Sequence, residues 1–212
     1  QMRGGGMLAT IKIISYGVPR AALEEACAAA RGAIRLAAPK IASAALVITD
    51  IPGGAGDKGR DAVAERVAAF GVPLPEPELV RHAVAPLCEA LLRCDAEMIL
   101  ILTGSATSDI DDVAPSAVRQ AGGSIARFGM PVDPGNLLFI GELGGRPVIG
   151  LPGCARAPAL NGADWVLARV MCGIAVTDAD ISGMGVGGLL KEIPSRPQPR
   201  RGSRKSGASG RE

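Results

Sequence analysis

One stretch decides the fold class of this chain: Met98-Ile99-Leu100-Ile101-Leu102-Thr103-Gly104-Ser105-Ala106-Thr107-Ser108-Asp109-Ile110-Asp111-Asp112-Val113-Ala114-Pro115. Its first five residues are apolar without interruption, which is typical of a strand buried on both faces of a parallel sheet. A loop of small, polar and acidic residues follows, and Asp112 with Pro115 marks the start of a helix. Ligands of open α/β sheets bind at the carboxyl ends of the strands, so a ligand site is expected first at this loop.

Strand and helix signals alternate on both sides of this stretch. Strands are expected at 44–49, 79–83, 97–102 and 124–128, and helices at 61–70, 86–94, 112–120 and 158–171. Segments 137–142 and 146–150 predict a β-hairpin that turns at Gly144-Gly145. The alternation therefore predicts an α/β fold with three layers, α/β/α, a mostly parallel sheet and a β-hairpin near the C-terminal part.

The chain divides into three parts by composition. Residues 1–42 are predicted to be an N-terminal strand–helix appendage, with a strand at 9–15 and a helix at 18–35. Residues 43–176 hold the α/β pattern. No strong element is predicted after Val176, and residues 177–212 are interpreted as a Gly/Pro/Arg-rich junction or disordered tail.

Composition argues against several classes of function. Aromatic residues make up only 2% of a chain that is 48% hydrophobic, which disfavours nucleic-acid binding by base stacking. The net charge is +2, and a basic surplus is concentrated in 191–212. Five cysteines without a C-x-x-C pair indicate reduced thiols and a cytoplasmic protein. No apolar run reaches the length of a membrane span, so no membrane partner is expected.

Four loops are candidates for ligand contact: 50–59 (the first loop), 103–112 (the second loop), 151–154 (the third loop, which Arg156 directly follows) and 134–136 (the fourth loop). Their small residues let the backbone approach a ligand closely, and N–H groups beside a helix N-terminus can bind a phosphate. Aspartate oxygens can hold Mg²⁺. We expect these loops to converge on one cleft.

The loop motifs resemble those of the molybdopterin-binding domain family, which includes molybdopterin adenylyltransferases and molybdenum insertion proteins. Thr103-Gly104-Ser105 followed by Asp112 is similar to the family's Thr/Ser-Gly-Gly loop with a helix-opening Asp. Pro134-Gly135-Asn136, the hairpin and Leu151-Pro152-Gly153 are similar to the pattern of the insertion proteins. Asp50 with Gly56-Asp57-Lys58 resembles the first loop. The resemblance covers roughly residues 43–173.

The resemblance is strongest to a subgroup in which this domain precedes a nucleotidyltransferase-like domain, because 183–197 looks like the junction of those proteins. It implies a molybdopterin-binding domain that binds and presents the pterin phosphate in molybdenum cofactor biosynthesis. Molybdopterin or its adenylylated form is the implied ligand, with Mg and ATP. An active member would carry out nucleotidyl transfer to molybdopterin or molybdate insertion. The alternative is a non-catalytic scaffold or oligomerisation domain for an attached nucleotidyltransferase, with ligand binding lost.

The resemblance also assigns site residues and partners. Asp112 and Asp57 take the catalytic positions, and Asp112 is the Mg ligand. The implied ligand-binding residues are Thr103, Gly104, Ser105, Thr107, Ser108, Pro134, Gly135, Asn136, Pro152, Gly153, Cys154, Lys58 and Arg156. The implied partners are the small-molecule pterin, a nucleotidyltransferase domain or molybdenum enzyme, and further copies of the chain in a homo-oligomer, for which a trimer is one option.

Four positions depart from the family pattern, one of them Asp109, which stands where a small residue is usual. Ser105 replaces the second loop glycine, Asn136 replaces the lysine after Pro-Gly, and Cys154 replaces the usual Asn or Ser after Leu-Pro-Gly. Loss of these groups favours binding and presentation over independent catalysis.

Several site residues also have plain structural interpretations. Asp112 fits a helix N-cap, and Arg156 fits a surface arginine. Cys154 fits either a thiolate at a helix N-terminus, where the pKa falls, or a small buried filler. Asp57 with Lys58, and Asp109 with Asp111, fit solvated loop charges. Two residues outside the loops are interpreted structurally: His82 as part of a strand, Trp165 as core or subunit interface.

Overall fold

The fold is described from a computed structural model, which covers residue 9 and residues 15–185. The strand expected at 9–15 lies almost wholly outside the described residues. So do the tail from residue 186 onward and most of the segment that resembles an interdomain junction.

A six-stranded sheet forms the centre of the fold, and its strands lie in the order β2-β1-β3-β6-β5-β4. The strands are β1 (Ala44–Asp50), β2 (Glu78–Arg81), β3 (Met98–Leu102), β4 (Ser124–Phe128), β5 (Phe139–Leu143) and β6 (Arg146–Leu151). β2, β1, β3 and β6 run parallel, whereas β5 pairs antiparallel with both β6 and β4. The predicted hairpin is β5–β6, and the turn is at Gly144-Gly145 as expected.

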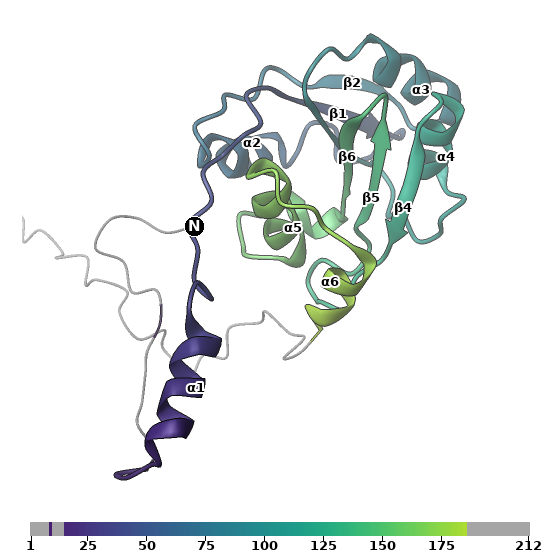
Figure 1. The fold of residues 1–212 in the computed structure, drawn as a ribbon. Helices are drawn as coiled ribbons and strands as arrows, with labels where there is room; N and C mark the ends of the chain where they lie inside the picture. Colours follow the sequence, from purple (N-terminus) through teal and green to yellow (C-terminus); the bar gives the residue numbers. More distant parts are fainter. Residues whose placement is uncertain (1–8, 10–14, 186–212) are drawn as a thin grey trace, which may run out of the picture.

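Helices cover both faces of the sheet (Figure 1). They are α2 (Arg60–Ala68), α3 (Val84–Arg93), α4 (Val113–Gln120), α5 (Gly162–Met171) and α6 (Asp178–Gly183). A further helix, α1 (Arg20–Ala30), precedes the sheet in the chain, and a 3₁₀ turn η1 spans Gly153–Arg156. α3 and α4 pack on one face, and α2, α5 and α6 pack on the other. The predicted three-layer α/β/α architecture with a mostly parallel sheet is therefore confirmed.

β3 is the most deeply buried strand, as its apolar run predicts. All five of its side chains are fully buried. Met98, Leu100 and Leu102 belong to the core beneath α2 and α5, whereas Ile99 and Ile101 belong to the core beneath α3 and α4. Alternate side chains of a strand point to opposite faces of the sheet, so β3 contributes to both hydrophobic cores. Every one of its positions is therefore apolar.

α5 begins later than the sequence predicts. The expected helix at 158–171 starts instead after Asn161, whose side chain accepts a hydrogen bond from the Ala163 N–H at 2.8 Å. Asp164 returns a bond to the Asn161 N–H at 2.8 Å, which completes a capping box. The capping residues fix the start of the helix, and Pro158 remains in the preceding loop.

A short helix follows where no strong element was predicted. Thr177 and Asp180 form a capping box at the start of α6, and Ile181 is fully buried against the α2–α5 core. Asp178 pairs with Arg127 of β4. No strong element was predicted after Val176, and the structure has the short helix α6 there, stabilised by its capping box and by the burial of Ile181 and Met184.

α1 projects away from the rest of the fold (Figure 1), and none of its residues is buried. The chain rejoins the body where the Lys40 and Ile41 N–H groups donate to the Met171 carbonyl oxygen at 2.7 and 3.2 Å. The division into an appendage at 1–42, a domain at 43–176 and a tail stays a prediction. Among the residues described, no helix combines the length and the apolar character that crossing a membrane requires.

Candidate functional site

The first loop, 51–59, follows β1 at the carboxyl edge of the sheet. Asp50 fixes its fold by accepting a hydrogen bond from the Gly56 N–H at 3.0 Å. Asp57 and Lys58 are exposed at the far end of the loop. There they line an open pocket of about 630 Å³ together with Ala55, Gly59, Arg60, Asp61, Arg156 and Ala157. The structure thus places two predicted site residues of the first loop beside Arg156 of the third.

Arg156 connects three segments of the site. From η1, its guanidinium donates one hydrogen bond to the Lys58 carbonyl oxygen and another, 2.8 Å long, to the Thr103 carbonyl oxygen. The residue is half-buried, and this burial lowers the pKa of its guanidinium, while the charge of Asp50 acts in the opposite direction. Arg156 therefore lies partly at the surface, but its guanidinium is bonded to two loop carbonyl groups. Its hydrogen bonds hold the first and second loops to the third.

The second loop begins with a close approach to β1. The Gly104 N–H donates to Thr49 Oγ1 at 3.1 Å, and a Cβ on Gly104 would lie 2.7 Å from the Thr49 carbonyl oxygen. Thr49 Oγ1 also lies 2.7 Å from His82 Nδ1 at the end of β2. Glycine is needed at 104 because the loop touches the neighbouring strand. His82 was expected inside the strand, but β2 ends at Arg81, and His82 follows the strand as a hydrogen-bond partner of Thr49.

Hydroxyl groups organise the next turn of this loop. Thr103 Oγ1 donates to the Ser105 carbonyl oxygen at 2.6 Å and lies 3.2 Å from Thr107 Oγ1. Thr103 and Thr107 are buried, whereas Ser105 and Ser108 are exposed. The exposed residues are therefore the members of this group that a ligand can reach first.

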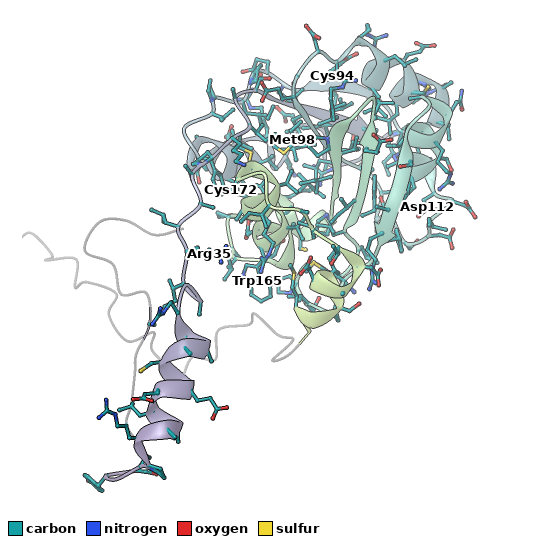
Figure 2. All side chains as sticks on the ribbon, viewed as in Figure 1. Arg35, Cys94, Met98, Asp112, Trp165 and Cys172 are labelled. Carbon is teal, nitrogen blue, oxygen red and sulfur yellow. The ribbon has the colours of Figure 1, made fainter. Side chains whose placement is uncertain are left out.

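Asp112 occupies the N-cap position of α4, but its carboxylate forms no hydrogen bond with the N–H groups of that helix. Its Oδ2 instead accepts from the Ser108 N–H at 2.6 Å and the Asp109 N–H at 3.0 Å. These two backbone donors lower the pKa of the carboxyl group. The N-cap interpretation is therefore corrected: the side chain closes the loop that precedes it. Figure 2 shows Asp112 at the surface on the α4 side of the sheet.

The two neighbouring carboxylates are held by local partners. Asp111 pairs with Arg119 of α4 at 2.8 Å, and Asp109 Oδ1 accepts the Asp111 N–H at 2.7 Å. Both residues are exposed, in agreement with their interpretation as solvated charges. Each partner reduces the repulsion that three carboxylates in four residues would otherwise exert on an anionic ligand.

The fourth loop lies beside the N-terminus of α5. The Gly162 N–H donates to the Pro134 carbonyl oxygen at 2.8 Å. Gly135 has a φ of 133°, and a Cβ there would lie 2.6 Å from the Gly162 nitrogen. Asn136 is exposed, and its carbonyl oxygen accepts from the Met130 N–H at 3.0 Å. Glycine at 135 thus allows this loop to lie directly against α5.

Cys154 is exposed as a residue, so the interpretation as a small buried filler is wrong. Partial burial of its thiol raises the pKa of that group, and the charge of Asp133 adds to the rise. The Gly135 N–H and the charge of Arg66 act in the opposite direction without reversing it. The expectation of a low-pKa thiolate at this helix N-terminus is therefore also wrong, because desolvation outweighs the nearby positive charge.

Hydrogen bonds join some of the predicted site residues and leave others apart. Lys58, Thr103 and Arg156 are connected directly, and Cys154 lies near Gly135. Within residues 15–185, no hydrogen bond runs between loop 103–112 and loop 134–136. Pro152 is buried and Gly153 is exposed.

The part of the chain that the structure describes has no cluster of three or more His, Cys, Asp or Glu side chains that would hold a metal ion. Asp112 fits Mg²⁺ in a limited way, since an aspartate is ionised at neutral pH and carboxylate oxygen is the ligand that Mg²⁺ prefers, but one carboxylate alone does not make a metal site. Mg²⁺ is usually held by one or two carboxylates together with phosphates of the substrate. Asp112 would be the protein's contribution to such a site.

Two residues that position the loops were missed at the sequence level. Thr49 reads as one more residue of a buried strand, yet it holds the second loop and His82. Arg66 reads as a polar position of a helix, yet its guanidinium bonds backbone carbonyl groups around the third loop. For Thr49, a hydroxyl at the end of an apolar strand is a weak sequence signal. For Arg66, no sequence signal indicates its role.

These elements define an α/β domain whose loops gather at the carboxyl edge of a mostly parallel sheet. Residues 41–170 match the molybdenum cofactor biosynthesis family whose description is "probable molybdopterin binding domain". The chain belongs to this molybdopterin-binding domain family. All four candidate loops lie inside the matched residues.

Comparison with solved structures gives a more distant likeness. The molybdopterin biosynthesis MoeA protein from Pyrococcus horikosii is similar with 18% identity and a TM-score of 0.44. The match covers 62% of this chain and 33% of that chain, so this chain corresponds to about a third of the archaeal protein. No curated protein sequence matches this chain significantly. The subgroup fused to a nucleotidyltransferase-like domain stays a prediction.

Proposed function

We propose that this domain binds molybdopterin through its phosphate and presents it in molybdenum cofactor biosynthesis. The observation that carries the proposal is the bonding of Arg156 to both the first and second loops, inside the residues that match the family. Three loops from distant parts of the sequence thereby form one surface. A preorganised surface of this kind lowers the entropic cost of ordering loops around a ligand.

Lys58 is the proposed contact for the phosphate. Its side chain is exposed in the open pocket at the first loop, whereas the Arg156 guanidinium is already engaged with two carbonyl groups. The exposed hydroxyls of Ser105 and Ser108 offer further donors to phosphate oxygens. In this proposal Arg156 supports the site, and Lys58 supplies the free positive charge.

Catalysis is a separate question. Adenylylation of molybdopterin or insertion of molybdate would require Mg and ATP or molybdate in addition to the pterin, and Asp112 and Asp57 are the proposed carboxylates for that chemistry. Asp112 would have to give up or share its bonds to Ser108 and Asp109. For this reason we propose binding and presentation as the main role.

Anaerobic titration calorimetry with molybdopterin, and separately with Mg-ATP, tests the proposal. Heat with molybdopterin is expected, and Lys58→Gln should weaken binding by about tenfold, the equivalent of one charge-assisted hydrogen bond. Lys40→Gln is the matched control, since the Lys40 backbone bonds the end of α5, away from these loops. A folded protein that gives no heat with either ligand would contradict the proposal. Pyrophosphate released from ATP in the presence of molybdopterin would add catalysis to it.

A second candidate is a scaffold or oligomerisation domain for an attached nucleotidyltransferase. One observation favours it: α2 and α5 border a largely apolar hollow of about 430 Å³, lined in part by Phe70, Leu160 and Trp165. Figure 2 shows Trp165 on this side of the molecule. Light scattering distinguishes the candidates, because a stable trimer that binds no molybdopterin supports the scaffold alone.

A further inference from the structure

Arg66 makes the densest set of hydrogen bonds around the candidate site, although it belongs to none of the loops. Its side chain is only 11% exposed. Nε donates to Asp164 Oδ1 at 2.6 Å, and Nη1 donates to the Ala62 and Ala155 carbonyl oxygens at 3.0 and 2.9 Å. Nη2 donates to the carbonyl oxygens of two further residues, Ala157 and Ala159, at 2.8 and 2.9 Å. An arginine has five N–H donors, and here each of the five has an acceptor.

Three of these acceptors are alternate carbonyl groups of the segment 155–159. This segment contains the end of η1 and the connection to α5, with no strand or α-helix of its own. Arg66 on α2 therefore supplies bonds that regular structure would otherwise provide. Without the guanidinium, the carbonyl oxygen of the buried Ala155 would lose a partner, which is costly in a packed interior. The carbonyl groups of Ala157 and Ala159, whose residues are exposed, would lose the bonds that hold the segment to α2.

The same segment carries Arg156, which extends the connection to the other loops. Arg66 holds the backbone on both sides of Arg156, and Arg156 in turn donates to the carbonyl oxygens of Lys58 and Thr103. The first arginine fixes the third loop, and the second arginine fixes the first two loops to it. Arg66 therefore influences the first two loops indirectly, through its effect on the position of Arg156.

Asp164 links this arrangement to the fourth loop. Its Oδ1 accepts from Arg66, and its Oδ2 accepts from the Asn161 N–H at the start of α5. The neighbouring Gly162 N–H bonds Pro134. One carboxylate therefore connects α2, the N-terminus of α5 and, through one further residue, the loop at 134–136.

We infer that Arg66 is a positioning residue for the ligand site, acting through segment 155–159 and Arg156 rather than by contact with ligand. The inference rests on the proposed molybdopterin site. Lysine cannot replace this arginine, because its ammonium has three donors on one atom and no planar fork to reach acceptors on both sides. Arg66→Lys is therefore the decisive test, because lysine keeps the positive charge but loses the planar, forked arrangement of donors.

Hydrogen–deuterium exchange and molybdopterin titration on the full chain test the inference. In Arg66→Lys we expect faster exchange in peptides covering 151–160, 56–60 and 103–108, unchanged exchange in β4 and β5, and about tenfold weaker molybdopterin binding, the worth of one lost charge-assisted bond. Arg146→Lys is the matched control. Arg146 is also half-buried and bonds two carbonyl groups, of Leu143 and Cys94, but at the start of β6, the opposite edge of the sheet.

Asp164→Asn is the second variant, because it keeps an acceptor for Arg66 and should change the same peptides less. Faster exchange spread evenly over the sheet in Arg66→Lys, or wild-type molybdopterin affinity in that variant, would overturn the positioning role. Absence of molybdopterin binding by the unsubstituted protein would overturn the proposed function instead. In that case the exchange pattern alone still decides whether Arg66 holds the loops.

Discussion

Arg156 Nη2 lies 2.8 Å from the carbonyl oxygen of Thr103, so the third loop is bonded to the residue that directly follows the central strand. The Thr103 carbonyl is the first one beyond the regular bonding of β3. An arginine side chain therefore satisfies a backbone group at the point where the sheet ends and the second loop begins. The architecture of the candidate site depends on this bond as much as on the residues that face solvent.

Replacement of Arg156 by lysine should weaken this junction. An ammonium cannot bond both the Lys58 and Thr103 carbonyl oxygens as the planar guanidinium does. We expect the free energy of unfolding to fall by about 1–3 kcal/mol, measured by urea denaturation. Arg93→Lys serves as the control, because Arg93 is exposed and pairs only with Glu78. An equal loss of stability in the two variants would show that the junction has no special role.

Gly104→Ala should destabilise the fold through a backbone collision. The new methyl group would lie 2.7 Å from the Thr49 carbonyl oxygen, so β1 or the second loop must move. We expect a loss of about 1–3 kcal/mol in the free energy of unfolding, typical of overpacking. Gly153→Ala is the matched control, since a methyl group there meets nothing within 4 Å. Wild-type stability of Gly104→Ala would mean that the loop is free to shift away from β1.

The sequence predicts the sheet and its helices well because burial leaves a direct pattern. The uninterrupted apolar run of β3 arises from contact with helices on both faces, and all of its side chains are buried. Helix ends are less visible. The residues that start α5, Asn161 and Asp164, are ordinary polar residues until their mutual bonds are seen.

The candidate site is predictable only where side chains carry recognisable chemistry. Asp112 is found at the expected helix start, but the direction of its carboxylate, toward Ser108, depends on loop geometry. Arg66 could not be predicted, because its acceptors at Ala155, Ala157 and Ala159 are carbonyl groups 89 to 93 residues away. Every residue has a carbonyl, so the sequence contains no sign of which ones a distant arginine will bond.

The carboxyl group of Asp112 should titrate below its ordinary value of 3.8. The N–H donors of Ser108 and Asp109 favour the charged form, so their stabilisation of the loop is fully present above pH 3.8 and is lost as the pH falls through the lowered pKa. Amide shifts of Ser108 and Asp109, followed by NMR during acidification, measure this midpoint. In Asp112→Asn the same shifts should not titrate. A midpoint at or above 3.8 would contradict the observed hydrogen bonds.

Alkylation of Cys154 should be slow at neutral pH. Desolvation raises the pKa of its thiol above the ordinary value of 9.0, and only the thiolate reacts rapidly. The iodoacetamide rate of the Cys154 peptide, measured by mass spectrometry, should therefore still be rising at pH 9. Asp133→Asn should shift the rate profile to lower pH, because the Asp133 charge contributes to the rise. A plateau reached below pH 9 in the unsubstituted protein would instead indicate an activated thiolate beside α5.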